Sequence, residues 1–286
     1  MQIKGTTKLL GIIGNPIEHS KSPLMQNSAI EALNLDYVYV PFDVKTEDLE
    51  TVLKGFEAMN VRGFNVTIPH KENIIPLLSD ITYIARKIGA VNTVYWTKQG
   101  WEGTNTDIDG FIAPLKALDV DWSQIVPLVL GAGGASRAVI VGLDELGCPN
   151  VRVVARDYEK CADFRDSFIY TPLKCSHIWA HTWDQIADIL PHSNMIVNAT
   201  PLGMYPNVDV SPLTEKDNEL ITDEFIVYDL IYTPRPTLLL QQAQQKGAIS
   251  IDGSEMLVQQ GAKAFEIWTG KKAPVDIMRQ VLLNGK

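Results

Sequence analysis

The chain has few cysteines and no long apolar segment. Its three cysteines, Cys148, Cys161 and Cys175, are an odd number, and no two of them have Cys-x-x-Cys spacing. We therefore expect reduced thiols without a structural role. No run approaches the roughly 18 to 20 apolar residues that cross a bilayer, and the N-terminus lacks the charged-then-apolar pattern of a secretory signal. These absences predict a cytoplasmic protein without a membrane partner.

Positive charge is scarce as well. The chain has 25 Lys and Arg residues against 34 Asp and Glu residues, which gives a formal net charge of −9. No cluster of Lys or Arg interrupts this excess. Nucleic-acid surfaces need a basic patch, so no nucleic-acid partner is expected.

Only one pair of histidines has a spacing that suggests a metal. His177 and His181 stand at i and i+4, where a helix would present both rings to one ion. Trp179 lies between them and no third ligand is near. We therefore expect an ordinary pair of histidines and no metal site.

A glycine-rich turn is present near the middle of the 286 residues. The apolar run 126–130 leads directly into Gly131, Ala132, Gly133, Gly134 and Ala135, and a helical pattern follows. Glycines let the backbone approach a pyrophosphate, and the N–H groups of the next helix face the ligand. Ser136 stands where the strict pattern has a third glycine or an alanine. The segment predicts a dinucleotide-binding strand-to-helix turn.

The rest of the chain alternates between extended and helical patterns, which is typical of an α/β fold with a largely parallel sheet. Ser22 is expected to cap a helix that has Pro23 at its first position, and Thr46 to cap the next. The C-terminal segment from Gly253 is expected to be helical and to return to the first domain. Strands are expected at 9–13, 37–44, 63–68, 90–96, 126–130, 151–155, 195–198, 225–231 and 249–251. Further helices are expected at 71–78, 81–88, 107–118, 135–146, 159–167 and 237–246.

Four segments upstream of the glycine turn place polar groups at predicted strand ends and tight turns, where an α/β sheet builds its crevice. Each segment alone could be structural, as a helix cap, a turn or a solvated helix start. Together, their hydroxyls, amides, one lysine and one aspartate suit a small polyhydroxylated acid. Lys71 and Asp107 are the pair able to move a proton and hold charge. The segments are 19–23, 65–71, 90–93 and 103–107.

These motifs, in this order, resemble the shikimate dehydrogenase family over essentially the whole chain. The resemblance implies reversible reduction of 3-dehydroshikimate to shikimate with NADPH, a step of aromatic amino acid (chorismate) biosynthesis. It also implies an N-terminal α/β substrate domain, a Rossmann-like domain, and an active site in the cleft between them, in a monomer or homodimer. The matching segments are 11–16, 19–23, 65–71, 90–93, 105–107, 131–135, 198–204, 228–232, 252–253, 256–258 and Gln260.

The resemblance also implies domain boundaries and site residues. The substrate domain would comprise 1–107 and C-terminal helices at about 253–286, and the NADP-binding domain 108–252. Contacts with the pyrophosphate would come from the glycine turn. The substrate would contact Ser20, Ser22, Asn65, Thr67, Lys71, Asn92, Asp107, Tyr232 and Gln260. The nicotinamide half of the cofactor would contact Asn198, Ala199, Thr200, Gly203, Leu230 and Gly253.

Lys71 fits the chemistry that this resemblance implies. Hydride delivery to a ketone leaves a developing alkoxide, which needs a proton and a nearby positive charge. We therefore expect Lys71 to be the acid in reduction and the base in oxidation, with Asp107 orienting and balancing it.

Cofactor choice depends on the residues after the second strand of the nucleotide domain. Relatives that use NADP commonly have Asn-Arg-Thr there, and this chain has Ala155, Arg156 and Asp157. Arg156 can stack on adenine and pair with a 2′-phosphate, or be only a solvated strand end. Asp157 can face a 2′-hydroxyl, which suits NAD, or cap the next helix. We expect NADP, with NAD as the alternative.

Two other functions remain open. A quinate or dual quinate/shikimate dehydrogenase would need room for an extra hydroxyl near Ser20 and Ser22, and both serines match the shikimate type. A non-catalytic regulator that senses the cofactor would have lost Lys71 or Asp107, and both are present.

Overall fold

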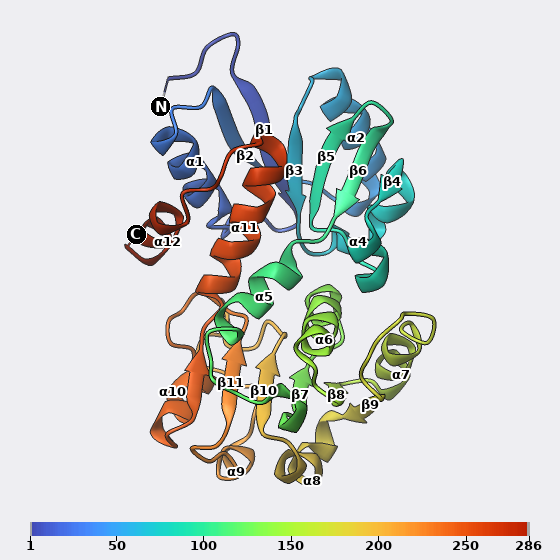
Figure 1. Cartoon of the computed structure of the whole chain (residues 1–286), viewed down its shortest axis with the longest axis vertical. Helices are drawn as coiled ribbons and strands as arrows, with labels where there is room; N and C mark the ends of the chain where they lie inside the picture. The colour runs from blue at the N-terminus through green and yellow to red at the C-terminus, as the bar shows by residue number, and fades with distance from the viewer. Residues whose placement is uncertain (1, 285–286) are drawn as a thin grey trace. The chain divides into compact units, whose positions relative to one another are not determined.

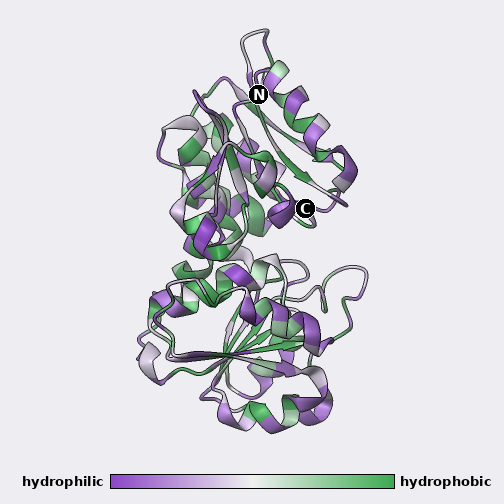
Figure 2. Ribbon diagram, turned by 90° about the vertical axis from the view of Figure 1, so that its right-hand side faces the viewer, coloured by the Kyte–Doolittle hydropathy of each residue, from purple (hydrophilic) through white to green (hydrophobic). Residues whose placement is uncertain are grey.

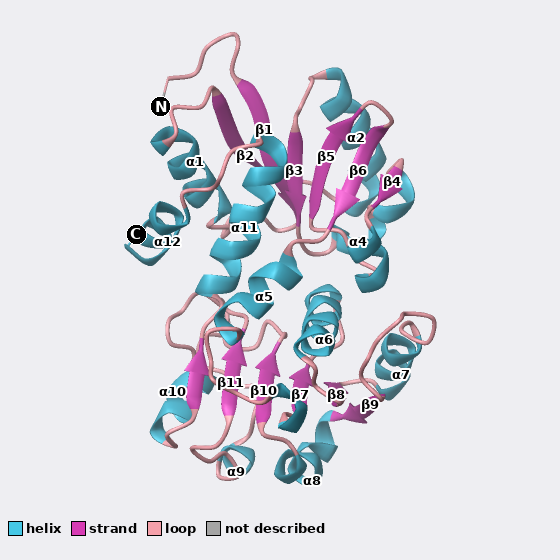
Figure 3. Ribbon diagram, viewed as in Figure 1, coloured by secondary structure: helices cyan, strands magenta, loops and turns pink. Residues whose placement is uncertain are grey.

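The computed structural model describes residues 2–284 and divides into two compact units. The first unit comprises the chain up to Gly110 together with the residues from Leu257 onward, and the second is Phe111–Met256. Figure 1 shows a sheet with flanking helices in each unit, and Figure 3 separates these elements by type. Among the described residues, no helix is both long and apolar enough to traverse a bilayer.

The first unit contains a six-stranded sheet in the order β2-β1-β3-β5-β6-β4. It is largely parallel, as expected, but one strand, β5, runs antiparallel to both β3 and β6. The physical reason is a tight hairpin between β5 and β6, which the sequence analysis did not identify. The strands are β1 (Lys8–Gly14), β2 (Tyr37–Asp43), β3 (Gly63–Val66), β4 (Asp80–Ile81), β5 (Thr93–Thr97) and β6 (Gly100–Thr104).

Helices cover both faces of this sheet because its strands alternate their side chains between two cores. On β1, Leu10 and Ile12 join the core under α1, α11 and α12, whereas Ile13 joins the core under α2, α3 and α4. The C-terminal helices thus complete the core of the first unit. The helices are α1 (Ser22–Ala32), α2 (Leu49–Ala58), α3 (His70–Asn73), α4 (Tyr83–Ile88), α11 (Ser254–Thr269) and α12 (Val275–Asn284).

Neither predicted cap in this unit is found. Ser22 is the first residue of α1 rather than its cap, because the carbonyl of Lys21 already accepts a hydrogen bond from the N–H of Met25. Thr46 lies within a 3₁₀ turn that precedes α2, and its hydroxyl makes no capping bond. In both cases the polar residue is the first residue of its turn and the preceding lysine is the cap, so the predicted cap position was wrong by one residue.

The second unit contains a six-stranded sheet in the order β12-β11-β10-β7-β8-β9, and every pair is parallel. This is the strand order of a Rossmann fold, whose direction of winding switches between β7 and β10. The strands are β7 (Pro127–Leu130), β8 (Asn150–Ala155), β9 (His177–Thr182), β10 (Met195–Asn198), β11 (Ile226–Asp229) and β12 (Ile249–Ile251).

Helices flank this sheet as well, and Figure 2 shows hydrophobic strands between helices that carry both hydrophilic and hydrophobic residues. One face packs Leu128, Ile196 and Val227 against α8, α10 and the apolar residues on either side of α9. On the other face, Phe111 of α5 stacks on Tyr228 with ring centroids 5.2 Å apart. The helices are α5 (Asp107–Leu115), α6 (Gly134–Leu146), α7 (Tyr158–Asp166), α8 (Ile186–Ile189), α9 (Glu215–Asn218) and α10 (Leu238–Gln245).

Strand β9 changes the interpretation of the histidine pair. His177 and His181 lie on this edge strand and not on a helix. Four residues along a strand span about 13 Å, too far for two side chains to share an ion. Within residues 2–284, no group of three His, Cys, Asp or Glu residues could hold a metal.

Candidate active site

The predicted substrate residues of the first unit gather at one edge of its sheet. The chain leaves β1, β3 and β6 at this edge, and antiparallel β5 begins there, with Thr93 opposite both Asn65 and Thr104. Loops that follow or precede these strands therefore converge, although they lie up to 90 residues apart in sequence. This convergence follows from the mixed topology, which places the amino end of β5 beside the carboxyl ends of its neighbours.

Lys71 and Asp107 form an ion pair at this edge. Lys71 is supplied by α3, just after β3, and Asp107 is the first residue of α5. The lysine Nζ lies 2.5 Å from Oδ2 of Asp107, and the two side chains are only 14% and 7% exposed. Asp107 also lies at the N-terminus of its helix, where the helix dipole favours a negative charge. The pair is thus a fixed ammonium, partly shielded from water, beside a fixed carboxylate.

Asn92 holds the other side of this carboxylate. Its buried amide donates to Oδ1 of Asp107 at 2.8 Å and to Thr106 at 3.0 Å. The side-chain oxygen of Asn92, Oδ1, accepts from the Thr106 N–H at 2.8 Å. Gln260 of α11 joins the group, since its Oε1 lies 3.4 Å from the amide nitrogen of Asn92. Both oxygens of Asp107 therefore have partners, and its orientation is set by three elements of the fold.

Asn65 is fixed by a residue that the sequence analysis missed. The hydroxyl of Tyr39, on β2, donates to Oδ1 of Asn65 at 2.7 Å, and the amide donates to the Asn92 carbonyl and to Thr93, both at 3.1 Å. Burial raises the pKa of Tyr39 well above its ordinary value, so its hydroxyl stays a donor. Nothing in the alternating pattern of this strand distinguishes Tyr39 from a core aromatic residue.

Ser20, Ser22 and Thr67 lie at the end of β1 and β3, with fewer connections. The N–H of Ser22 donates to the hydroxyl of Ser20 at 3.3 Å. The methyl of Thr67 lies so close to Gly14 that a side-chain carbon there would approach it to 2.4 Å. Glycine at the end of β1 therefore permits the loop after β3 to fold over it. Ser20 and Thr67 lie in short loops at the polar edge, and Ser22 is the first residue of α1.

In the second unit, the glycine turn after β7 meets the loop after β10 at the switch point, since a side-chain carbon at Gly131 would lie 3.1 Å from the methyl of Thr200. Gly131 follows β7 with a φ of +105°, a conformation that side chains rarely allow. Gly133 has an extended backbone, and a side-chain carbon there would meet no protein atom within 4 Å. The fold itself therefore does not require a glycine at 133. An open position in front of the N-terminus of α6 fits a pyrophosphate that approaches the backbone closely.

The loop after β10 is organised by Asn198. This buried residue accepts from the N–H and the hydroxyl of Thr200 at 3.0 and 2.7 Å, and donates to the carbonyl of Leu202 and to Asp229. Asp229 also accepts from Thr237 at 2.7 Å and from the Ile231 N–H at 3.1 Å. Burial raises the pKa of Asp229 to about 6, against the lowering effect of these donors.

Leu230 and Gly253 lie in direct contact. A side-chain carbon at Gly253 would lie 2.0 Å from the carbonyl oxygen of Leu230, and the Gly253 N–H donates to Ile231 at 3.1 Å. Glycine is therefore required at 253 for steric reasons. Tyr232, which the sequence analysis assigned to the substrate, belongs to the second unit and is partly buried.

Asp157 caps α7. Its Oδ1 accepts from the N–H groups of Glu159 and Lys160 at 2.9 and 3.3 Å. The capping interpretation is thus confirmed, and the carboxylate is occupied by backbone donors. Ala155 ends β8, and the side chain of Arg156 next to it is exposed at the carboxyl edge of the sheet.

The two units thus contain a Rossmann sheet with an open glycine turn and a mixed sheet with a lysine–aspartate pair among amides and hydroxyls. A fold and site of this kind define a dinucleotide-dependent oxidoreductase. Residues 12–94 match the family model of the shikimate dehydrogenase substrate binding domain, and residues 253–283 match that of the shikimate 5′-dehydrogenase C-terminal domain.

Similar proteins agree with these matches. A shikimate dehydrogenase (NADP(+)) of Gloeothece citriformis is 52% identical over 98% of this chain and 97% of its own length. The crystal structure of shikimate dehydrogenase from Aquifex aeolicus has a TM-score of 0.88 at 37% identity and covers 99% and 100% of the two chains. That of the Thermus thermophilus enzyme, in complex with NADP(H) and shikimate, has a TM-score of 0.83 at 34% identity over 97% and 99%. The chain belongs to the shikimate dehydrogenase family.

Proposed function

We propose that this chain catalyses the reversible NADPH-dependent reduction of 3-dehydroshikimate to shikimate, a step of aromatic amino acid biosynthesis. The observation that carries the proposal is the shielded ion pair of Lys71 and Asp107. The Asp107 carboxylate is held on one side by the Lys71 ammonium and on the other by the Asn92 amide. A ketone that becomes an alcohol needs a proton donor at its oxygen, and Lys71 combines a proton with a positive charge.

Lys71 is the general acid in this mechanism. Its Nζ gives a proton to the carbonyl oxygen as the alkoxide forms, and takes the proton back in the oxidation direction. Its charge stabilises the developing negative charge. Asp107 keeps the ammonium in place through the 2.5 Å contact and, through its helix, fixes the direction from which the proton arrives.

The remaining polar groups of the first unit bind the substrate. We assign its carboxylate to the hydroxyls of Ser20 and Ser22, and its ring hydroxyls to Asn65, Thr67, Asn92, Asp107 and Gln260. The bonds that fix Asn65 and Asn92 support this assignment, since immobilised amides hold a polyol at little entropic cost. Tyr232 is assigned to the substrate by its sequence motif.

The residues of the second unit suit the cofactor. When bound, NADPH supplies the hydride. We assign its pyrophosphate to Gly131, Ala132, Gly133, Gly134 and Ala135, where the open space at position 133 supports the assignment. Ala155, Arg156 and Asp157 would lie at the adenosine end. Asn198, Ala199, Thr200, Gly203, Leu230 and Gly253 would hold the nicotinamide half.

The division of the chain follows from these assignments. The unit that contains Lys71 is the substrate domain, and Phe111–Met256 is the NADP-binding domain. We propose a cytoplasmic enzyme that acts on a small molecule as a monomer or a homodimer. Light scattering during size-exclusion chromatography distinguishes the two oligomeric states.

Absorbance at the nicotinamide band, followed with shikimate or quinate and with NADP+ or NAD+, tests the function. We expect turnover with shikimate and NADP+ to exceed the other three combinations. Quinate oxidised at least as efficiently as shikimate would contradict the substrate assignment. Tight NADPH binding without turnover of either acid would instead favour a cofactor sensor.

A further inference from the structure

The first unit has a second polar and aromatic hollow at the opposite edge of its sheet. β1, β2 and β3 begin at this edge and antiparallel β5 ends there, about 20 Å along β1 from the edge that holds Lys71. A pocket of about 330 Å³ opens between these strand ends and the last turn of α11. It is lined by Lys8, Tyr37, Arg62, Tyr95, Trp96, Ile267 and Trp268.

Aromatic rings form most of the walls. Trp268 is held by a hydrogen bond of 3.0 Å from its indole N–H to the carbonyl of Val94. Trp96 packs edge-on against Trp101 at 4.8 Å and is one-third exposed. The hydroxyl of Tyr95 donates to Glu102 at 3.3 Å. These rings are fixed by the fold, so they offer π-faces to a ligand without the entropic cost of ordering.

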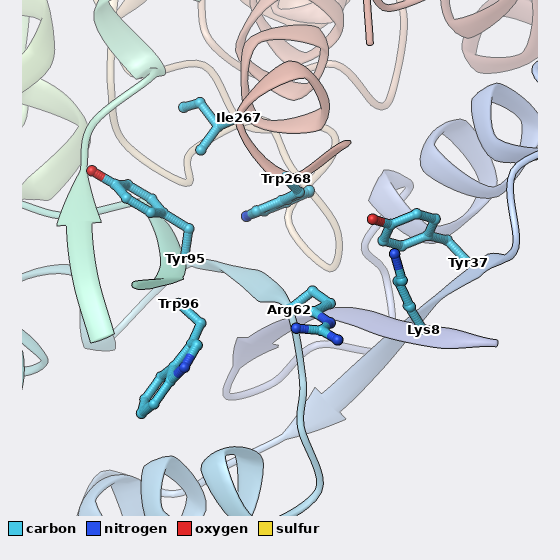
Figure 4. Close-up of a pocket in the computed structure, with 7 residues that line it drawn as sticks. All are labelled: Lys8, Tyr37, Arg62, Tyr95, Trp96, Ile267 and Trp268. Atoms are coloured by element: carbon cyan, nitrogen blue, oxygen red, sulfur yellow. The ribbon is translucent and has the colours of Figure 1, made fainter. Parts of the chain in front are cut away.

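Two cations accompany the rings, and no carboxylate lines the pocket. Figure 4 shows Arg62 in the middle of the group, with Trp268 near it and Trp96 and Lys8 to either side. The Nε of Arg62 is buried and has no hydrogen-bond partner among the described residues. A buried guanidinium nitrogen without a partner is costly, so its presence points to an acceptor that the chain does not itself provide.

Lys8 is balanced differently. Its ammonium lies 5.1 Å from the ring centre of Tyr37, and Asp36 lies close enough to interact with it electrostatically. Asp36 is in turn bonded to the hydroxyls of Thr6 and Thr7 at 2.6 and 2.7 Å. Among the described residues, Arg62 is therefore the cation with a guanidinium nitrogen that lacks an acceptor, and Lys8 adds an exposed positive charge.

We propose that this pocket is a binding site for a small aromatic carboxylate, separate from the site that contains Lys71. The ring of the ligand packs against Tyr95 and Trp268, and its carboxylate pairs with the guanidinium of Arg62. The planar fork of arginine suits a carboxylate, which it binds with two parallel hydrogen bonds. A ligand with an adjacent ammonium is disfavoured, because the pocket offers two cations and no acid to receive it.

Isothermal titration calorimetry on the whole protein tests the site with four matched probes. 3-Phenylpropanoate is the expected ligand, with a Kd of about 0.1 to 1 mM for a compound of this size. Phenylalanine adds an ammonium, 3-phenylpropanol removes the charge and cyclohexanepropanoate removes the aromatic ring. Each is expected to bind at least tenfold more weakly. Equal binding of the alcohol or the cyclohexane acid would overturn the proposed class of ligand.

The variant Arg62→Gln separates this site from others on the protein. The side chain of Arg62 makes no hydrogen bond through Nε, so its replacement should leave the fold and shikimate turnover unchanged. We expect the affinity for 3-phenylpropanoate to fall at least tenfold. Arg86→Gln is the control, since Arg86 is an exposed arginine of the same unit paired with Asp80. Unchanged binding by Arg62→Gln, or no binding to the parent protein at 10 times the expected Kd, would refute the proposal.

Discussion

The candidate sites of the two units are made of different parts of the chain. In the first unit, the candidate site consists of side chains: Lys71, Asp107 and Asn92 are joined to one another by ion-pair and amide contacts. In the second, the glycine turn presents backbone N–H groups, and its most informative position, Gly133, has no side chain at all. Each site lies at the edge of a six-stranded sheet where loops converge.

The difference teaches where each site is vulnerable. A site made of side chains fails when an atom is removed, because a proton or a charge is then missing at one place. A site made of backbone fails when an atom is added, because a ligand can no longer approach.

Replacing the acid of the first unit should have the greatest effect. Lys71→Met keeps much of the volume of the side chain and removes its proton and charge. We expect turnover to fall by about 10² to 10⁴, the range for a general acid–base group, while NADPH affinity stays within a factor of two. Steady-state kinetics and calorimetric titration of NADPH measure the two quantities.

Lys54→Met is the matched control, because Lys54 forms an exposed ion pair with Glu50 at 2.7 Å in the same unit. Its turnover should equal that of the parent protein. Near-parental turnover by Lys71→Met would remove Lys71 from the mechanism.

Asp229 tests the contrast between a side-chain site and a backbone site. It is a buried ionisable side chain in the unit whose candidate cofactor site presents mainly backbone groups. Its pKa is raised from 3.8 to about 6 in the folded state. The folded protein therefore binds this proton more tightly than the unfolded chain, so the contribution of Asp229 to stability is present below pH 4 and is lost as the pH rises to about 6. The loss amounts to about 3 kcal/mol at neutral pH.

Asp229→Asn should remove this term, since an amide can still accept from Asn198 and Ile231. Relative to the parent protein, the variant should gain up to about 3 kcal/mol of unfolding free energy between pH 4 and pH 7. Urea unfolding at several pH values measures the difference. Asp119→Asn changes an exposed aspartate of the same unit and should show no such trend. A parallel pH profile for Asp229→Asn and the parent would contradict the raised pKa.

Cofactor selection should respond to Arg156 and not to the aspartate beside it. Because Asp157 is occupied as a helix cap, we expect Asp157→Asn to preserve the preference for NADP. Arg156→Ala should weaken NADPH by about 30-fold and NADH much less, as one charge-assisted pair is lost. Arg165→Ala, on the neighbouring helix, is the control, since it pairs with Asp166. Equal weakening of both cofactors would show that Arg156 recognises adenine and not phosphate.

Two glycines of the nucleotide turn provide the smallest and most specific test. Gly133→Ala meets no protein atom, so stability should stay within about 0.5 kcal/mol while NADPH affinity falls about tenfold. Gly131→Ala should instead destabilise the fold by about 1 to 2 kcal/mol, because φ there is +105°. Thermal unfolding and cofactor titration separate the two. Unchanged affinity in Gly133→Ala would mean that no ligand approaches this position.

The sequence predicts the parts of the molecule that depend on local patterns. The extents of β10 and β12 agree with those expected, and the glycine turn lies between a strand and a helix as its pattern requires. Strand β9 was not predicted because its polar and aromatic residues form an exposed edge. Strand β4 was not predicted because two residues are too few to show the alternation of apolar and polar residues that marks a strand. The antiparallel direction of β5 was not predicted, because strand direction follows from hairpin pairing and not from hydrophobicity.

The connections within the candidate site are harder to predict. The contact of Asn92 with Gln260 joins residues 168 positions apart, and the bond of Tyr39 to Asn65 passes across β1, which separates their two strands. Such contacts depend on strand order, which single-residue patterns do not encode. Family motifs identified the residues that could react, whereas the structure alone shows which groups hold them.

The contact of Trp268 with Gly63 bears on the order in which the two units are completed while the protein is synthesised. A side-chain carbon at Gly63 would lie 2.2 Å from the indole of Trp268. Strand β3 therefore packs directly against a residue that lies more than 200 positions further along the chain. Phe111–Met256 is continuous and is synthesised before Leu257. The nucleotide unit is therefore fully synthesised while the sheet that begins with the first strand still lacks its C-terminal helices. The unit whose synthesis starts first is the one that is completed last.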